Sequence, residues 1–550
     1  MRKFRYPALA LLMAAPAMAA DLTGKALTNP TAYIPSQCYT ATEDEAGGVH
    51  NPCFTCHVRS RAPHYINDQD LQQAYSFPGP ALKNPWTNLF VDRTAAVLDT
   101  PDDEILAYVR ADNYHDAAGG IALAARLADL PAGWDADGDG AWAGFVPDAS
   151  YRFDAEGFDL DAAGRMTGWR AFAYQPLPGT FWPTNGSTDD VMIRLPVPFR
   201  AAADGTPDRG IYKLNLAITE ALIKRRDVGI APADEAALGV DLDLDGRIGT
   251  ATRVGFVFPP EDGRAMHYVG RAGVMQDAGT ARLAAGLYPE GTEFLHTVRY
   301  LDPVEGGIAM APRIKEVRYM VKTRWQTYFD RQEGALAEAK ERADFPDRIA
   351  LFDGNVETGI SNGTGWRLQG FIEDAQGELR PQTFEETVFC MGCHGGIGVT
   401  DDDTFAFPRK LDNSAFQGGW AHWTQGRGLR GVPELIREDG SPEYAHYLRA
   451  NGAGDEFRGN MELLEAWLDD QGQLDDDRAE GFRDDIAALL YPSAKRALAL
   501  NVAYREIVRE QSFIRGRDAT IVPQGNVHRE VTQDRQTGVI NPERPWYGAD

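Results

Sequence analysis

The sequence predicts an α+β protein in which mostly helical, loop-rich regions at both ends flank a mixed α/β-rich middle region. Two observations predict this class. A five-residue cysteine–histidine pattern occurs once near each end, whereas the middle, 131–380, contains no Cys. Apolar residues at helical spacing recur at both ends, while short β-rich runs separated by Gly and Asp turns occur in the middle.

The first residues predict an export signal. Arg2, Lys3 and Arg5 precede an apolar stretch, and Ala17-Met18-Ala19 offers a small-x-small cleavage site. The apolar stretch is too short to span a membrane, and no later run reaches the roughly 20 apolar residues that a spanning helix needs. We therefore expect a signal peptide over 1–19, no transmembrane segment after its removal, and a mature protein in the periplasm or at the cell surface.

Three regions follow the signal. The first, 20–130, is loop-rich, with breaks such as Asn51-Pro52 and Pro78-Gly79-Pro80, and reads as helical over 102–130. The middle, 131–380, is predicted to form strands over Val191–Pro196, Val254–Phe258, Phe294–Tyr300 and Val317–Val321, with helices near 212–225 and 328–342. The last, 381–550, is predicted to form helices near 461–469, 479–490 and 493–514, followed by a polar tail.

The repeated pattern is the strongest chemical signal. Cys53-Phe54-Thr55-Cys56-His57 returns as Cys390-Met391-Gly392-Cys393-His394, and together the two use four of the 5 Cys in the chain. C-x-x-C-H is the attachment site of a c-type haem, in which both thiols bond the porphyrin and the His becomes the proximal iron ligand. On a helical turn these three positions share a face. Zinc binding or a redox dithiol is the alternative, but the two pairs are far apart and each is followed by His.

These motifs define the predicted domains. We expect a first haem c region at 20–130, a haem-free middle at 131–380, and a second haem c region with the C-terminal tail at 381–550. The fifth cysteine, Cys38, has no role that the sequence assigns.

The second axial position of each iron decides its chemistry, because two strong ligands favour electron transfer and an open position favours substrate binding. His64 follows the first motif by one short segment, and His422 lies between two tryptophans in Trp420-Ala421-His422-Trp423. We expect these two as distal iron ligands. The other local candidates are His50, His115, His446 and Met461.

Two acidic loops in the middle region suggest calcium. Asp135, Asp137 and Asp139, like Asp241, Asp243 and Asp245, alternate with other residues and end on a Gly. Alternating carboxylates with a tight Gly turn suit a hard, oxygen-binding cation. Neither loop has a Glu at position twelve, so these loops resemble calcium sites without being EF-hands.

The net charge of the chain indicates which kinds of binding partner to expect. The chain carries a formal net charge of −26, which argues against nucleic acid and anionic membrane surfaces. A basic redox partner protein fits this charge. Nothing in the sequence specifies an oligomeric state.

On its two pentapeptides and export signal, the chain resembles exported bacterial di-haem c-type cytochromes. The resemblance implies haem bonded at Cys53, Cys56, Cys390 and Cys393, with His57 and His394 as proximal ligands. We expect electron transfer through two haems. One alternative is a peroxidase- or oxygenase-like oxidoreductase with one open iron, and another is a binding or scaffold protein with structural haem.

Overall fold

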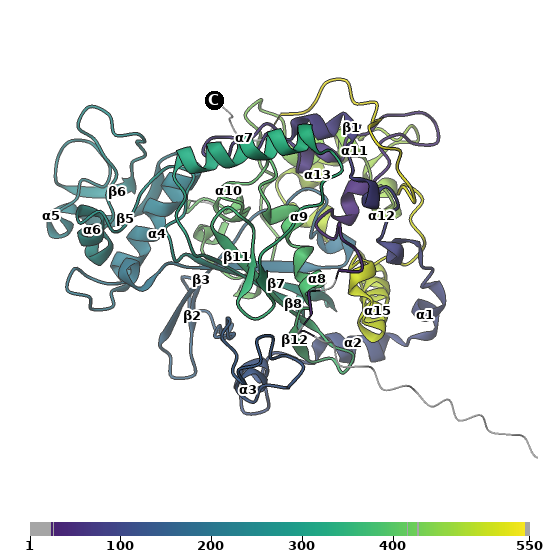
Figure 1. Ribbon diagram of the computed structural model, residues 1–550, viewed down its shortest axis with the longest axis horizontal. Helices are drawn as coiled ribbons and strands as arrows, with labels where there is room; N and C mark the ends of the chain where they lie inside the picture. The colour runs from purple at the N-terminus through teal and green to yellow at the C-terminus, as the bar shows by residue number, and fades with distance from the viewer. Residues whose placement is uncertain (1–21, 23, 26, 415, 426–427, 545–550) are drawn as a thin grey trace, which may run out of the picture.

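The computed structural model describes residues 22, 24–25, 27–414, 416–425 and 428–544 (Figure 1). The predicted signal peptide, 1–19, lies outside the described residues. Helices account for 31% of the structure and strands for 19%. Within the described ranges, every helix is too short or too polar to cross a lipid bilayer.

An antiparallel sheet of nine strands forms the centre of the molecule, so the predicted fold class, mostly helical regions at both ends around a mixed middle region, is wrong. The sheet pairs segments that are distant in sequence, and local periodicity cannot reveal such pairing. In spatial order its strands are β2 (Phe158–Leu160), β3 (Met166–Phe172), β4 (Thr188–Arg194), β7 (Glu293–Val304), β8 (Gly307–Lys322), β11 (Trp366–Glu373), β10 (Gly359–Ser361) and β9 (Gly354–Asn355), with β12 (Leu379–Pro381) also paired to β11.

The long hairpin β7–β8 forms the middle of this sheet. Val304 pairs with Gly307 across a tight turn, in which Gly306 adopts a φ of +84° that favours glycine. The register then places His296 of β7 opposite Arg318 of β8. This pair faces the candidate site described below.

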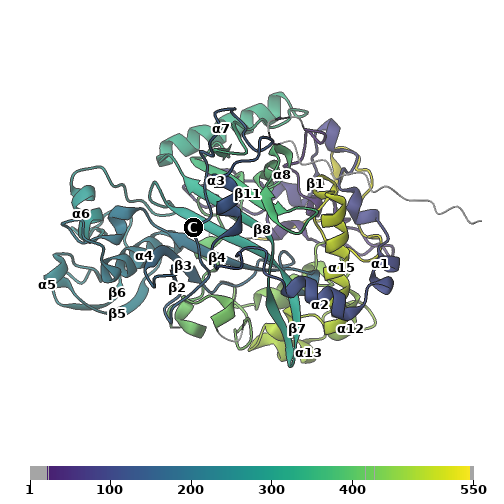
Figure 2. The ribbon, with the colours of Figure 1, turned by 90° about the horizontal axis from the view of Figure 1, so that it is seen from below.

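Helices from both ends of the chain cover part of the sheet. α15 (Ala494–Glu510) and α2 (Asp102–Arg110) lie beside β7 and β8, as Figure 2 shows from below. Ile105 and Val109 of α2 and Ile507 of α15 share a buried apolar cluster with Tyr300 of β7. Burying these side chains stabilises the packing of helices from the two ends of the chain on one sheet.

A small lobe lies at the opposite end of the molecule, on the left of Figure 1. It combines the two-stranded sheet β5 (Val228–Asp234) and β6 (Thr250–Val254) with α5 (Glu235–Leu238) and α6 (Gly270–Asp277). α4 (Arg209–Lys224) joins it to the rest. Asp208 caps α4, accepting from the Ile211 amide at 3.0 Å.

The predicted helices 212–225 and 328–342 correspond to α4 and α7 (Tyr328–Asp344), and α15 occupies most of the predicted helix 493–514. The predicted strand Val254–Phe258 is largely irregular, because β6 ends at Val254. The remaining helices are α1 (Thr94–Asp99), α3 (Ala122–Ala128), α8 (Phe384–Val388), α9 (Met391–His394), α10 (Ala406–Arg409), α11 (Glu443–Asn451), α12 (Met461–Trp467), α13 (Asp476–Arg483) and α14 (Ala487–Leu490).

The main hydrophobic core runs through all three predicted regions, from Leu22 through Trp169 to Val531. The chain ends also pair, since β1 (Ala74–Tyr75) forms a two-stranded sheet with β13 (Arg535–Gln536). The regions predicted at 20–130, 131–380 and 381–550 therefore contribute to one continuous core.

Candidate functional site

The first cysteine–histidine motif forms one tight helical turn. Residues Cys53–Thr55 make a 3-10 helix, and the His57 amide donates to the Cys53 carbonyl at 2.9 Å. This bond closes a turn from position one to position five. The two thiols and the imidazole therefore start from one turn, as a porphyrin attachment site requires.

The second motif repeats this geometry in another setting. Helix α8 leads directly into it, and the His394 amide donates to the Cys390 carbonyl at 3.0 Å. Thr383 and Glu386 form a capping box that starts α8. Arg380 holds the Glu386 carboxylate with two bonds of 2.8 and 2.9 Å, fixing α8 on the sheet.

The two motifs meet in space. The Val399 amide donates to the Cys56 carbonyl at 3.1 Å, and the Gly398 amide donates to both carboxylate oxygens of Asp68 at 3.1 Å, across 330 residues of sequence. A Cβ on Gly398 would lie 2.1 Å from the Val58 carbonyl oxygen, so only glycine allows this approach. The loop after the second motif is therefore bonded directly to the first motif.

Both motif histidines are oriented through the same ring nitrogen. Nδ1 of His57 lies 3.0 Å from Oδ2 of Asp68, and Nδ1 of His394 lies 2.8 Å from the Asp403 carbonyl oxygen. Histidines that bind a metal commonly donate their second N–H to a carboxylate or carbonyl in this way. With Nδ1 occupied in this way, Nε2 of each ring is the nitrogen that would bind an iron.

The two rings differ in charge. Burial alone would lower the pKa of His57, but Asp68 and Cys38 outweigh burial and raise that pKa to about 10. Burial lowers the pKa of His394 to about 4, against the opposing hydrogen bond to Asp403. In the absence of a metal, His57 is therefore cationic beside Asp68 and His394 is neutral.

The donor set fits covalent haem. All five thiols are free, and Cys53, Cys56 and Cys393 are half-buried. Burial raises the pKa of Cys53 and of Cys393 to about 12, so both are protonated thiols at neutral pH. Within the described ranges, the groups of three metal-binding side chains that converge contain only carboxylates, which argues against a compact zinc cage of these cysteines.

Cys38 lies beside this centre. Its thiol is within hydrogen-bonding reach of the His57 ring, and it interacts electrostatically with Cys53 and Cys393. The preceding segment also contacts the second motif, since a Cβ on Gly392 would lie 2.5 Å from the Tyr33 carbonyl oxygen. Residues 33–38 therefore pack between the two motifs.

The sheet contributes a cluster that the sequence did not indicate. His296 and Arg318, opposite each other on β7 and β8, are near enough to His394 to lower its pKa, after the larger effect of burial. Nε2 of His296 lies 2.9 Å from Oδ2 of Asp189, and its ring packs edge-on against Phe181 at 5.4 Å. His296 is nearly 100 residues before the second motif, so no local sequence signal connects the two.

The predicted distal ligands have other partners. Nε2 of His64 lies 3.1 Å from the Ile397 carbonyl oxygen, so His64 packs against the loop of the second motif. Both ring nitrogens of His422 have hydrogen-bond partners. Nε2 is bonded to Asp190, and Nδ1 lies 2.5 Å from Thr424 Oγ1. His446, considered for the second haem, instead packs edge-on against Phe54 of the first motif at 5.6 Å.

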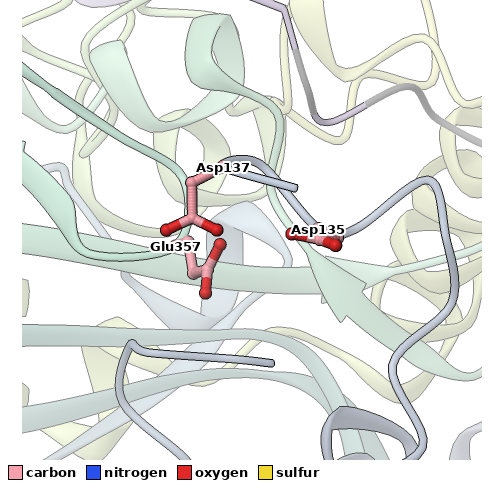
Figure 3. Close-up of side chains that lie close together, drawn as sticks. All are labelled: Asp135, Asp137 and Glu357. Atoms are coloured by element: carbon pink, nitrogen blue, oxygen red, sulfur yellow. The ribbon is translucent and has the colours of Figure 1, made fainter. Parts of the chain in front are cut away.

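The first acidic loop gains a partner from far along the chain. Ligand oxygens of Asp135, Asp137 and Glu357 lie within 4.8 Å of one another. Figure 3 shows these three side chains close together. Glu357 follows β9 and is fully buried. Asp139 is outside this group, and its carboxylate accepts from the Ala141 amide at 2.9 Å. Glu357 takes the place of the glutamate that the loop lacks.

The second acidic loop also lies close to a glutamate from outside the loop. Oxygens of Glu235, Asp241 and Asp243 lie within 4.8 Å of one another, whereas Asp245 is outside the group and accepts from the Arg247 amide at 2.8 Å. Oδ1 of Asp241 is buried and has no hydrogen-bond partner among the described residues. Each loop thus joins two of its three aspartates to a buried glutamate.

A family model described as a "-like lipoprotein" matches residues 22–486 of this chain. The chain belongs to this lipoprotein family. A family relative from Aquifex aeolicus (strain VF5), described as an uncharacterized lipoprotein, is 32% identical over 573 residues, which cover 94% of this chain and 92% of the relative. No solved structure matches the chain.

Membership of the lipoprotein family corrects the resemblance drawn from the two pentapeptides. The assignment to exported di-haem c-type cytochromes is wrong, and the descriptions cytochrome and oxidoreductase are withdrawn with it. The resemblance depended on two short motifs and an export signal, whereas the family match covers most of the chain. The family does indicate export to the cell envelope.

Proposed function

We propose that this lipoprotein-family member bonds one haem at each pentapeptide and transfers electrons through the pair. One observation carries the proposal: of two C-x-x-C-H turns, each with an oriented histidine, the first is hydrogen bonded to the loop that follows the second. Bound haem iron supplies one-electron redox chemistry. Cofactors bonded to touching segments would be neighbours and could exchange electrons directly.

The chain's own residues have distinct tasks in this proposal. The thiols of Cys53, Cys56, Cys390 and Cys393 would hold the porphyrins, and His57 and His394 would bind the irons. Asp68 orients His57 and fixes the Gly398 loop, so it couples the positions of the two sites. The surrounding core restricts water near both turns.

The deciding experiment is the intact mass and the optical spectrum of protein exported in a host that matures c-type haem. We expect the mass of two haems beyond that of the polypeptide, and thioether-type haem absorption. A colourless protein with the polypeptide mass alone would defeat the proposal.

The same sample separates electron transfer from catalysis at an open iron. If both ferric haems are low-spin and neither binds carbon monoxide when reduced, electron transfer is the function. A high-spin haem that binds carbon monoxide would instead show an open iron and contradict electron transfer as the whole function. His296 is the distal side chain to test first, because Asp189 orients it beside the second motif.

We propose that the acidic loops each bind a structural calcium ion, a proposal supported by Glu357 and Glu235 completing the two oxygen clusters. Calcium at a hundredfold excess over its Kd should stabilise the fold by about 2.7 kcal/mol per site. Glu357→Gln should remove this gain at the first site, whereas Asp139→Asn, outside the cluster, should retain it. Thermal melts with calcium and with a chelator check this, and identical melts in both would exclude the ions.

We propose that the protein works on the periplasmic side of the envelope, where an acidic surface favours a basic redox partner. The relative is described as a lipoprotein.

A further inference from the structure

The two motif histidines differ in the group that accepts their hydrogen bond. Oδ2 of Asp68 lies 3.0 Å from Nδ1 of His57, whereas the partner of His394 Nδ1 is the main-chain carbonyl of Asp403 at 2.8 Å. The first partner is an acidic side chain, and the second is an uncharged peptide group. The two rings therefore receive different electrostatic support from the protein.

The carboxylate of Asp68 is buried and acts mainly on the His57 ring. Asp68 is only 3% exposed, and His57 is its one ion-pair partner among the described residues. Its other side-chain bonds come from the Gly398 amide, which lies 3.1 Å from each oxygen. No lysine or arginine of the described chain forms an ion pair with it. Burial weakens screening by water, so its charge is felt strongly at the ring.

The second motif instead contacts a group with more positive than negative charge. The Arg517 guanidinium stacks at 4.9 Å over the ring of Phe389, the residue before Cys390. Oε2 of Glu316 accepts from Arg517 at 2.7 Å and from Arg318 at 3.0 Å, so two guanidinium groups share one carboxylate. Both side chains of the Arg517–Glu316 pair are buried. The remaining positive charge is therefore little screened beside the second motif.

These surroundings have opposite effects on an attached iron. A carboxylate hydrogen bonded to a ligating imidazole raises the basicity of the ring, which favours the oxidised metal. A neutral carbonyl does this to a smaller extent. A nearby buried guanidinium favours the reduced metal, because reduction lowers the positive charge of the iron. The first motif therefore favours ferric iron and the second favours ferrous iron.

We infer that Asp68 gives the haem bonded at Cys53 and Cys56 the lower midpoint potential, so that electrons pass from it to the haem at Cys390 and Cys393. The inference rests on the proposed function and adds a direction to it. The first iron is oxidised as the second is reduced, and one electron moves without a proton. A one-electron donor protein supplies the electron at the first motif, and a one-electron acceptor removes it at the second.

The first test assigns a midpoint potential to each motif in the full exported protein. The double variant Cys390→Ala/Cys393→Ala retains the thiols for the first haem, and Cys53→Ala/Cys56→Ala retains those for the second. Intact mass gives the haem content, and optical redox titration gives the potentials. We expect the variant that retains the first haem to have the lower potential.

Asp68→Asn tests whether the carboxylate sets this order. Asparagine keeps an oxygen that accepts hydrogen bonds but removes the charge, so the lower potential should rise while the higher one changes less. Asp68→Glu keeps the charge and should have a lower potential than Asp68→Asn. Asp70→Asn is the matched control, because Asp70 is exposed in the same segment and lies 3.9 Å from Arg342, away from the ring. The control should keep both wild-type potentials.

Two results would overturn the inference. One is a potential of the first haem that equals or exceeds that of the second in the single-haem variants. The other is a potential in Asp68→Asn no higher than in Asp70→Asn. If circular dichroism shows that Asp68→Asn does not fold, the order of the single-haem potentials decides. Absence of haem mass from the wild-type protein would instead contradict the proposed function, which is a separate result.

Discussion

Replacing both Cys390 and Cys393 with alanine is expected to remove one of the two haems and to halve the visible absorbance. Attachment of each haem depends on its own pair of thiols, and these two belong only to the second turn. The first motif should keep its haem. Because the Val399 amide contacts the Cys56 carbonyl, the spectrum and potential of the remaining haem should also shift.

Cys38→Ala is the matched control for this variant. Its thiol lies beside the same centre but belongs to neither pentapeptide, so the control should carry both haems. Intact mass and haem absorbance per polypeptide check both proteins. Two haems in the double variant, or one in the Cys38→Ala control, would contradict the assignment of the thiols.

Asp402→Ala is expected to lower the free energy of unfolding by about 3–5 kcal/mol. Asp402 is 1% exposed and accepts from Lys322 Nζ at 2.6 Å, from Arg331, and from the Tyr288 amide at 2.9 Å. Alanine would leave the buried Lys322 without its carboxylate and Arg331 with only Asp403. Since Asp403 orients His394, the second motif should loosen as well.

Urea unfolding of Asp402→Ala and of Asp344→Ala measures this effect. Asp344 pairs with Lys340 on the exposed surface of α7, where such pairs contribute less than about 1 kcal/mol. A loss in Asp402→Ala no larger than in the control would show that the buried cluster contributes nothing. The difference between the two variants isolates burial, because each removes one carboxylate from an ion pair.

The same cluster predicts how stability depends on pH. Burial alone would raise the pKa of Asp402, but Lys322 and Arg331 hold that pKa below its ordinary value. A carboxyl group with a lowered pKa in the folded state stabilises the protein above its unfolded pKa, near 4. Its contribution should therefore be complete at neutral pH and be lost as pH falls below about 4, and Asp402→Ala should lose less stability there than the wild type.

Local sequence patterns predicted the helices better than the sheet. The regular apolar spacing of α4 and α15 is visible in the sequence, because these helices each bury one face. The sequence pattern identified only Val317–Val321 of strand β8, since the strand also contains the charged Lys315 and Glu316, which are buried in place of apolar residues. Lys315 Nζ is satisfied by the Gly186 carbonyl at 2.6 Å, a partner that only the folded chain supplies.

The local motifs of the candidate site could be predicted from the sequence, but their arrangement in space could not. The pentapeptides and the acidic loops are local patterns with fixed spacing. Their partners Asp68, His296 and Glu357 come from tertiary packing, and no spacing rule connects Glu357 to a loop more than 200 residues earlier. Each motif turn is local, while the contact between the turns depends on Gly398 reaching the Val58 backbone.

The pairing of β1 with β13 has a consequence for biogenesis. The last strand closes beside the segment that follows the first pentapeptide, and the Thr537 amide donates to the Gln73 carbonyl at 2.9 Å. A polypeptide emerging from its translocation channel therefore displays the leading pair of thiols well before its trailing end can cover them. Maturation enzymes would act within that interval, and a chain truncated before β13 would leave this end of the protein without its closing strand.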